Sequence, residues 1–288
     1  MKSILKWLKV IRLGTLIITF CPIAIGIIIA AKTFNTDINW LVAFVTLICG
    51  MSLQALTNMV NDYYDYKRGL DNKDYIGYEK PLVAGLVSMK ELKRGIGVDL
   101  GLAILLGSLL IYNGGLPILI IGVFSIITAI FYTATNKSLS HFGIGDIFVF
   151  IVFGSMASVG TTYLQTGFFS LESMWLGMVC GSIATNVLAV DNIRDQESDG
   201  AANRKSIVVC YGRRAGEIEY LLFVILSLVF SFLAKPWSIL NLIFIIGMIL
   251  FFLLLKTRGE KYNSILMATS FSNVFFLILV LIQYLIIQ

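Results

Sequence analysis

The chain has 288 residues, of which 58% are hydrophobic and only 14% are charged, with a formal net charge of +5. Soluble globular domains average about 45–50% apolar and about 25% charged residues. A soluble domain of this size has too little interior to hide such an apolar excess, so the composition excludes that class and implies a protein embedded in a bilayer. The single histidine, His141, excludes chemistry that needs two imidazoles, and the four cysteines form no Cys-x-x-Cys pair of the zinc or redox type.

Apolar runs of the length that crosses a hydrocarbon core, about 20 residues for about 30 Å, recur along the whole chain. The first follows Lys2, Lys6 and Lys9 and lacks a small-residue cleavage site, so we interpret it as an uncleaved helix and not a signal peptide. Gly and Pro in the shortest links indicate tight turns between antiparallel helices. We predict an all-α membrane protein with nine transmembrane helices, at residues 11–31, 40–60, 95–112, 117–135, 143–164, 172–190, 218–234, 237–255 and 264–286.

The basic residues are sorted by side of the membrane. Of the 22 Lys and Arg residues, only Lys32 and Lys235 fall in segments on the side opposite the N-terminus. Cytoplasmic loops carry the excess of Lys and Arg in membrane proteins. We therefore expect a multi-pass protein of the cell membrane with its N-terminus in the cytoplasm and, after nine helices, its C-terminus outside.

An acidic cluster follows the second predicted helix. Asp62 and Asp65 are spaced i, i+3 and share one helical face, which Asn61, Asn58 and Gln54 extend back toward the membrane. A second cluster follows the sixth predicted helix.

In that second cluster Asp191, Asp195 and Asp199 are spaced i, i+4, i+8, so they also share one face if the helix continues beyond the membrane. Like charges at this spacing destabilise a helix and need a compensating cation. Mg²⁺ fits, because it takes oxygen ligands from one or two carboxylates and completes its shell with water and substrate phosphate. Basic residues that can pair with the remaining phosphate oxygens interleave with the acids: Lys67, Arg68, Arg194, Arg204 and Lys205.

At these residues the chain resembles the UbiA superfamily of intramembrane prenyltransferases. That family carries an Asn-Asp-x-x-Asp type motif after helix 2 and an Asp-x-x-x-Asp motif after helix 6, which here read Asn61-Asp62-x-x-Asp65 and Asp195-x-x-x-Asp199. The nine-helix layout matches too, so the resemblance covers nearly the whole chain. Within the superfamily the sequence is most similar to the 1,4-dihydroxy-2-naphthoate prenyltransferases of menaquinone synthesis. The departures are Asp191 where that group has Asn, Asp146 where it has Glu, and the basic loop at Lys80.

The resemblance implies one transmembrane prenyltransferase domain over residues 1–288, with cytoplasmic loops 61–94 and 191–217 forming a cap over the active site. It implies Mg²⁺ as the cofactor and, as partners, a polyprenyl diphosphate, a small aromatic acceptor and the lipid bilayer, with no nucleic acid. The metal-binding residues that it implies are Asn61, Asp62, Asp65, Asp191, Asp195 and Asp199.

The resemblance also implies residue roles around the metals. The residues implied in catalysis are Asp62, Asp65, Asp195, Asp199 and Lys137. Those implied in binding the diphosphate are Lys67, Arg68, Arg194 and Lys205. Those implied in binding the acceptor are Arg12, Asn58, Tyr132 and Asp146, with Arg12 as a partner for a ring carboxylate.

Two alternatives stay open at this point. One is an enzyme of the same superfamily with another aromatic acceptor, such as 4-hydroxybenzoate. The other is a cation-coupled transporter, whose site would be expected near the bilayer midplane on broken helices, whereas the acids here gather at helix ends.

Overall fold

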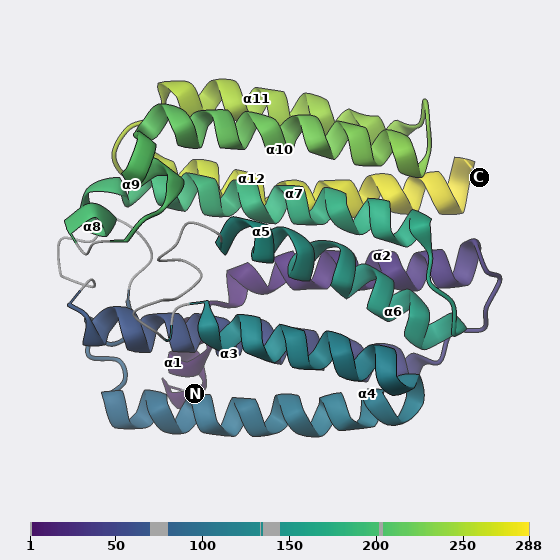
Figure 1. Ribbon diagram of the computed structural model, residues 1–288, viewed down its shortest axis with the longest axis horizontal. Coiled ribbons are helices and arrows are strands. Elements are labelled where there is room, and N and C mark those ends of the chain that lie inside the picture. Colours follow the sequence, from purple (N-terminus) through teal and green to yellow (C-terminus); the bar gives the residue numbers. More distant parts are fainter. Residues whose placement is uncertain (1, 70–79, 133, 135–144, 202–203, 288) are drawn as a thin grey trace.

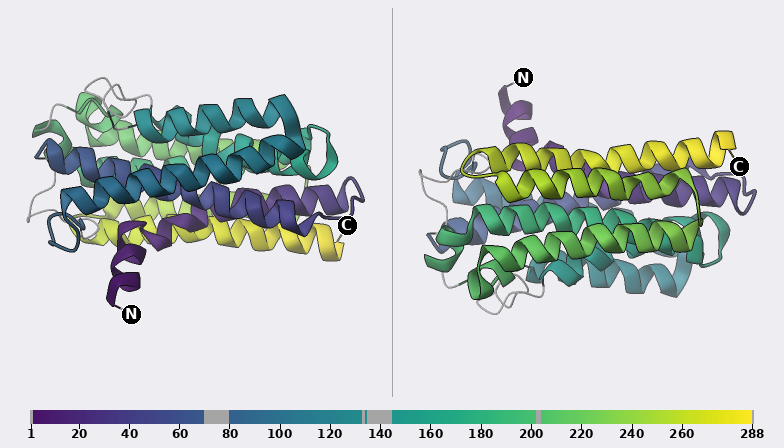
Figure 2. Two further views of the ribbon diagram at one scale, coloured as in Figure 1. Left: turned by 90° about the horizontal axis from the view of Figure 1, so that it is seen from below. Right: turned by 90° about the horizontal axis from the view of Figure 1, so that it is seen from above.

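The computed structural model describes residues 2–69, 80–132, 134, 145–201 and 204–287, and the regular elements in these ranges are all helical. The long helices run alongside one another in a single bundle (Figure 1). The N-terminal helix α1 (Lys2–Val10) projects from the side of this bundle (Figure 2). The helices long enough to cross a membrane are α2 (Ile17–Lys32, preceded by the short turn Leu13–Leu16), α3 (Trp40–Lys67), α4 (Met89–Phe131), α5 and α6 (Gly145–Phe150 and Ala157–Thr166, joined by the π-helical turn Ile151–Met156), α7 (Leu171–Arg194), α10 (Arg213–Ala234), α11 (Leu242–Lys256, preceded by the turn Ile239–Asn241) and α12 (Lys261–Ile282, continued by the π-helical turn Gln283–Ile287).

Helix α4 accounts for two crossings of the membrane. It is 43 residues long, about twice what a bilayer needs. Gly115 has φ 63° and ψ −147°, which no helix contains, and the chain reverses there, so that the two limbs of α4 lie antiparallel (Figure 1). The eight candidate spans in the described ranges thus give nine crossings, as the sequence predicted.

Helix α7 lies at the centre of the bundle. In its apolar window 78% of the residues are buried, against 22% for α4 and α11, which face outward. Small residues allow close packing: a Cβ on Gly181 would lie 2.3 Å from the carbonyl oxygen of Phe150 and 3.1 Å from the Cα of Gly154. Such contacts between backbones are typical of small residues in membrane helices. Because α7 is central, its polar C-terminal part lies among the other helices at one end of the bundle (Figure 1).

Both acidic clusters begin within helices, which corrects the predicted loop boundaries. Helix α3 continues to Lys67 and therefore carries Asp62 and Asp65. Helix α7 continues to Arg194, bends at Asp195, and is followed directly by α8 (Gln196–Ala201). The amide of Asp195 donates to the carbonyl of Asp191 over 2.9 Å, and that of Asp199 to the carbonyl of Asp195 over 2.8 Å. The i, i+4 geometry therefore survives the bend.

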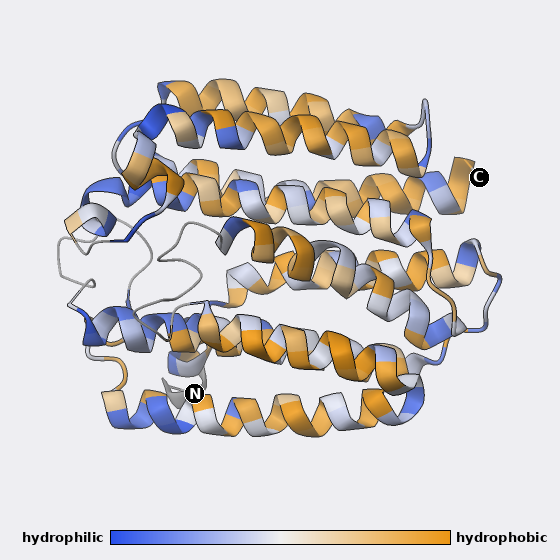
Figure 3. Ribbon diagram, in the orientation of Figure 1, coloured by the Kyte–Doolittle hydropathy of each residue, from blue (hydrophilic) through white to orange (hydrophobic). Residues whose placement is uncertain are grey.

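Hydrophilic residues gather at the two ends of the bundle, and hydrophobic residues fill the stretch between them (Figure 3). Helices α8 and α9 (Ile207–Tyr211) lie at the same end as the acidic ends of α3 and α7 (Figure 1). That the chain forms a single domain with residues 61–94 and 191–217 as a cap over the site stays a prediction.

Candidate active site

The first acidic cluster is buried and bound by basic side chains from two other segments. Asp62 and Asp65 are 1% and 3% exposed. Asp62 Oδ1 accepts a hydrogen bond from Arg12 and lies 3.4 Å from Lys80 Nζ. Lys80 Nζ also lies 3.9 Å from Asp65 Oδ2, so that it bridges the two carboxylates of α3. Arg12 lies just before the turn that leads into α2, and its own backbone has φ 54°, in the left-handed region.

The second cluster is organised around Arg194. Its Nε and Nη2 donate to the two oxygens of Asp195 over 2.7 and 2.8 Å. Nη2 is also 2.7 Å from Asp191 Oδ1, and Nη1 donates to Asn263 of α12 over 3.0 Å. This fork geometry is the strong form of an ion pair.

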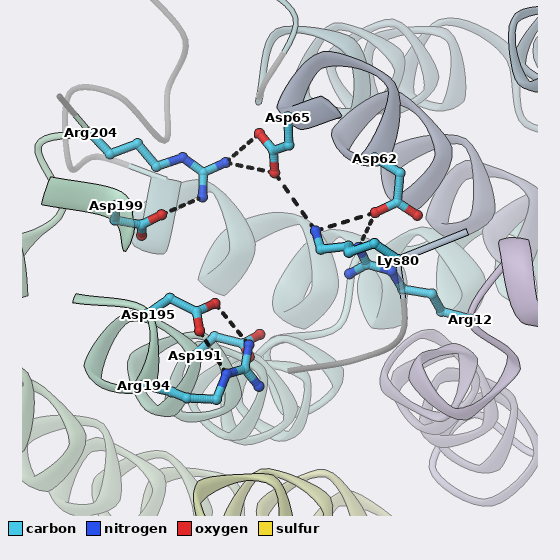
Figure 4. A network of polar contacts seen from close by, with 9 residues as sticks. All are labelled: Arg12, Asp62, Asp65, Lys80, Asp191, Arg194, Asp195, Asp199 and Arg204. Carbon is cyan, nitrogen blue, oxygen red and sulfur yellow. Dashed lines mark hydrogen bonds and ion pairs between the residues drawn. The ribbon is translucent and has the colours of Figure 1, made fainter. Parts of the chain in front are cut away.

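Arg204 joins the two clusters (Figure 4). It donates to both oxygens of Asp65 over 2.9 and 3.1 Å and to Asp199 Oδ1 over 3.1 Å. Burial opposes the charged form of Arg204, but the carboxylates of Asp65 and Asp199 raise its pKa, so it stays protonated. Burial raises the pKa of Asp199 to about 6, even though Arg204 acts in the opposite direction.

Two cavities meet at this network. The larger one, which we name the polar cavity, encloses about 830 Å³ and is lined by residues of both acidic clusters. The smaller one, the apolar chamber, encloses about 260 Å³ between α2, α3, α4, α6 and α7. The residues that line both cavities mark where the two spaces join: Arg12, Thr15, Asn61, Tyr132, Leu188 and Asp191.

Most of the predicted metal ligands face the polar cavity. Asp62 does not line it, but lies behind Arg12 and Lys80. The predicted ligands that line the cavity are Asn61, Asp65, Asp191, Asp195 and Asp199, together with Arg194 from the predicted diphosphate set.

The residues predicted to bind the acceptor divide into two groups. Arg12, Asn58 and Tyr132 line the apolar chamber. Asn58 is engaged, because its Nδ2 donates to the Ile11 carbonyl and to Thr15 Oγ1. Asp146 is 5% exposed and lines neither cavity, so its role stays a prediction that this geometry does not support.

Three of the residues predicted to bind the diphosphate lie away from the cavity. Lys67, Arg68 and Lys205 are exposed and do not line it, and Arg68 lies over the ring of Tyr64. Lys137 lies outside the described residues.

Instead, the network contains Lys80, which the sequence reasoning did not assign, and Arg204, which it noted among the basic residues without giving it a role. Spacing alone gives no signal for Lys80, whereas Arg204 lies only five residues after Asp199 in the sequence, and that short separation is a signal that could have found it.

The donor chemistry of the site fits Mg²⁺. The donors are carboxylate and amide oxygens, and Asp62 Oδ2 is buried with no hydrogen-bond partner. Five carboxylates face four cationic groups in the network, so a polyanion needs further positive charge to bind there. In the described ranges no three acidic side chains converge on one point. The arrangement suits a metal held jointly by the protein and a phosphate ligand, more than a closed cage made by the protein alone.

The fold and these side chains together define a multi-pass α-helical membrane protein with a network of acidic and basic side chains at one end of the bundle (Figure 4). Residues 19–281 match the UbiA prenyltransferase family, and the chain belongs to that family.

Relatives and solved structures agree with this assignment. The chain is 33% identical to the 1,4-dihydroxy-2-naphthoate octaprenyltransferase of Escherichia coli (strain K12) over 74% of this chain and 69% of that protein. It is 25% identical to the protein of the same name from Bacillus subtilis (strain 168), over 78% and 74%. A UbiA homolog from Archaeoglobus fulgidus, bound to GPP and Mg²⁺, shares the fold with a TM-score of 0.67 at 18% identity, over 96% of this chain and 98% of that one. A homolog from Aeropyrum pernix K1 reaches a TM-score of 0.71 at 14% identity, over 91% and 96%.

Proposed function

We propose that this protein transfers a polyprenyl group from polyprenyl diphosphate to 1,4-dihydroxy-2-naphthoate, the prenylation step of menaquinone synthesis, with Mg²⁺ as cofactor. The observation that carries the proposal is the meeting of two acidic helix ends around one cavity that continues into an apolar chamber. A charged diphosphate and an apolar aromatic ring need these two environments side by side. The names of the bacterial relatives support the naphthoate as acceptor.

The diphosphate would lie in the polar cavity. Arg194 and Arg204 line that cavity and, with Lys80, have N–H groups that can turn from carboxylate oxygens to phosphate oxygens. Asn61, Asp62, Asp65, Asp191, Asp195 and Asp199 would hold Mg²⁺. When bound, Mg²⁺ neutralises the charge that develops on the leaving diphosphate.

The reaction breaks the bond between allylic C1 and the diphosphate oxygen and forms a bond between C1 and a ring carbon of the acceptor. The diphosphate leaves with the electrons of the broken bond. The ring carbon that attacks C1 is the one that carries the carboxylate, so that CO₂ leaves from it and the electrons of the carbon–carboxylate bond return to the ring and restore its aromatic system. The residues of the chain orient the two substrates and keep water away from C1, which is electron-deficient in the transition state. The apolar walls of the chamber suit that task.

The prenyl tail needs an apolar path out of the polar cavity. Leu5, Leu13, Met267 and Phe271 line one side of this cavity and are each more than half exposed, so the cavity opens toward lipid between the N-terminal segment and α12. We infer that a long tail leaves through this opening into the bilayer. We further propose that the protein lies in the cell membrane with its N-terminus in the cytoplasm and its C-terminus outside.

The proposal is tested with purified protein in detergent, Mg²⁺, radiolabelled farnesyl diphosphate and 1,4-dihydroxy-2-naphthoate. We expect a prenylated, decarboxylated lipid product that disappears with EDTA and in Asp195→Ala. Product from 4-hydroxybenzoate but not from the naphthoate would retain the reaction class and reject the naphthoate as substrate. No transfer to any acceptor by folded protein that still binds the diphosphate would contradict the enzymatic proposal and favour transport.

A further inference from the structure

Three polar side chains in the wall of the apolar chamber have an oxygen with no hydrogen-bond partner. They are Thr19 of α2, Gln54 of α3 and Thr128 of α4, which are 3%, 7% and 5% exposed. Buried polar groups are nearly always hydrogen-bonded, because leaving one unpaired costs about 1–3 kcal/mol. Three such groups around one cavity therefore point to a polar ligand that forms the missing hydrogen bonds.

Other threonine hydroxyl groups in the same chamber do have hydrogen-bond partners. Thr46 donates to the Val42 carbonyl over 2.7 Å, and Thr57 to the Leu53 carbonyl over 2.9 Å. Thr161 donates in the same way to the Ala157 carbonyl over 2.7 Å. These threonine hydroxyls donate hydrogen bonds to carbonyl groups of the preceding helical turn. The apolar surroundings alone therefore do not explain why Thr19 and Thr128 lack a partner.

The three unpartnered groups lie at a defined depth below the acidic network. Gln54 is eight residues before Asp62 in the same helix, about 12 Å along the axis. A Cβ on Gly50, one turn further along α3, would be 3.0 Å from the methyl group of Thr19, so Thr19 lies beside this part of α3. Thr128 comes one turn before Tyr132, a residue that lines both cavities.

We propose that Gln54, Thr19 and Thr128 form the specificity site for the phenolic hydroxyl groups of the aromatic acceptor. This inference rests on the proposed function and names the residues that select its acceptor. A prenyl chain has no hydrogen-bonding atoms and leaves all three groups unpaired. A ring hydroxyl both donates and accepts, and therefore matches the Gln54 amide and the two threonine hydroxyls.

The size of the chamber agrees with this choice of ligand. About 260 Å³ is close to the lower end of small-molecule sites, which span about 300–1,000 Å³. A bicyclic ring suits this volume better than a long prenyl chain, for which the lipid-facing opening of the polar cavity offers another path. The ring would then lie directly below the diphosphate, with its far hydroxyl toward Gln54.

The test measures acceptor binding separately from turnover. Equilibrium dialysis without oxygen compares 1,4-dihydroxy-2-naphthoate with 1-hydroxy-2-naphthoate, which lacks the second hydroxyl. For Gln54→Leu we expect the Kd of the dihydroxy compound to rise about tenfold, the worth of one good hydrogen bond, and the preference over the monohydroxy compound to disappear. Thr46→Val is the matched control, because it removes a hydroxyl from the same chamber that already has a partner.

Thr128→Val is a second variant that keeps the test sharp if Gln54→Leu does not fold in detergent. Farnesyl diphosphate binding should be unchanged in all three variants. The inference is overturned if both Gln54→Leu and Thr128→Val bind the acceptor like the wild type, if Thr46→Val weakens binding equally, or if the wild type does not bind the naphthoate. Wild-type protein that binds the naphthoate with this selectivity but transfers no prenyl group would contradict the proposed function and leave the acceptor site standing.

Discussion

Arg204 and Lys205 are neighbours in the chain but have very different surroundings. Arg204 is largely buried and links Asp65 to Asp199, whereas Lys205 is exposed and does not line the polar cavity. The family resemblance implied that Lys205 binds the diphosphate, and by position and charge alone the two basic residues are equivalent. Only the direction in which each side chain leaves the backbone separates them.

We expect Arg204→Ala to lower kcat/KM for the prenyl diphosphate at least about 30-fold, because removing one partner from a buried charge network costs about 2–5 kcal/mol. Lys205→Ala, the matched control, should change the same quantity less than about threefold, as for an exposed charge. Steady-state kinetics with varied donor measure both variants. A loss in Lys205→Ala as large as that in Arg204→Ala would show that Lys205 also binds the diphosphate, as the resemblance implied.

Lys80 occupies the position between Asp62 and Asp65 that a divalent cation would also favour. Replacing it by Met removes a positive charge beside two carboxylates. We therefore expect Lys80→Met to bind Mg²⁺ more tightly in the absence of donor, by about three- to tenfold, and to raise the KM for the donor, because a phosphate partner is lost. Isothermal titration with Mg²⁺ and steady-state kinetics measure the two effects.

Lys67→Met serves as the control for this pair of effects, since Lys67 is exposed and lies outside the cavity. Weaker Mg²⁺ binding in Lys80→Met would mean that the lysine organises the carboxylates and does not compete with the metal.

At the scale of elements, the position of the site depends on how closely α7 approaches the π-helical turn between α5 and α6. A Cβ on Gly181 meets backbone atoms of Phe150 and Gly154, which cannot rotate away. We expect Gly181→Ala to destabilise the protein by about 1–3 kcal/mol, as overpacking does, and to lower the apparent Tm in detergent by several degrees.

Gly101→Ala is the corresponding control, because Gly101 is exposed on α4 and a Cβ there meets nothing within 4 Å. It should leave the Tm unchanged or raise it, since Ala favours a helix over Gly. A Tm for Gly181→Ala equal to that of Gly101→Ala would show that the bundle can relax at this crossing.

Element boundaries are where sequence and structure differ most. The apolar window of α3 ends near residue 60, but the helix continues to Lys67 because its backbone hydrogen bonds do not depend on lipid. The spacing of Asp191, Asp195 and Asp199 predicted a common face, and the bend at Asp195 preserves it. Periodicity thus predicts the relation among side chains on one helix better than it predicts the residue at which that helix ends.

At the scale of the whole molecule, the four cysteines provide a test of the expected orientation. Cys21, Cys49 and Cys180 are buried, and Cys210 is exposed on α9, at the acidic end of the bundle. If that end faces the cytoplasm, a membrane-impermeant maleimide should label Cys210 in inverted vesicles and not in intact cells.

Trp237→Cys in a Cys210→Ser background is the opposite control, because Trp237 is 90% exposed in the link between α10 and α11, at the other end of the bundle. It should be labelled in intact cells. The reverse pattern in both proteins would invert the topology and contradict the charge-based prediction.

The membrane class, the nine crossings and the two acidic faces could be predicted from the sequence, because these features depend on hydrophobic length and helical period, which are local properties of the chain. That Asp65 and Asp199, more than 130 residues apart, share one arginine became visible only in the folded chain. The tertiary structure also selected Lys80 and Arg204 over Lys67 and Lys205 in the network, and left Asp146 outside both cavities. Such choices depend on which helices pack together and where each side chain points, and both follow from long-range packing that no local pattern in the sequence encodes.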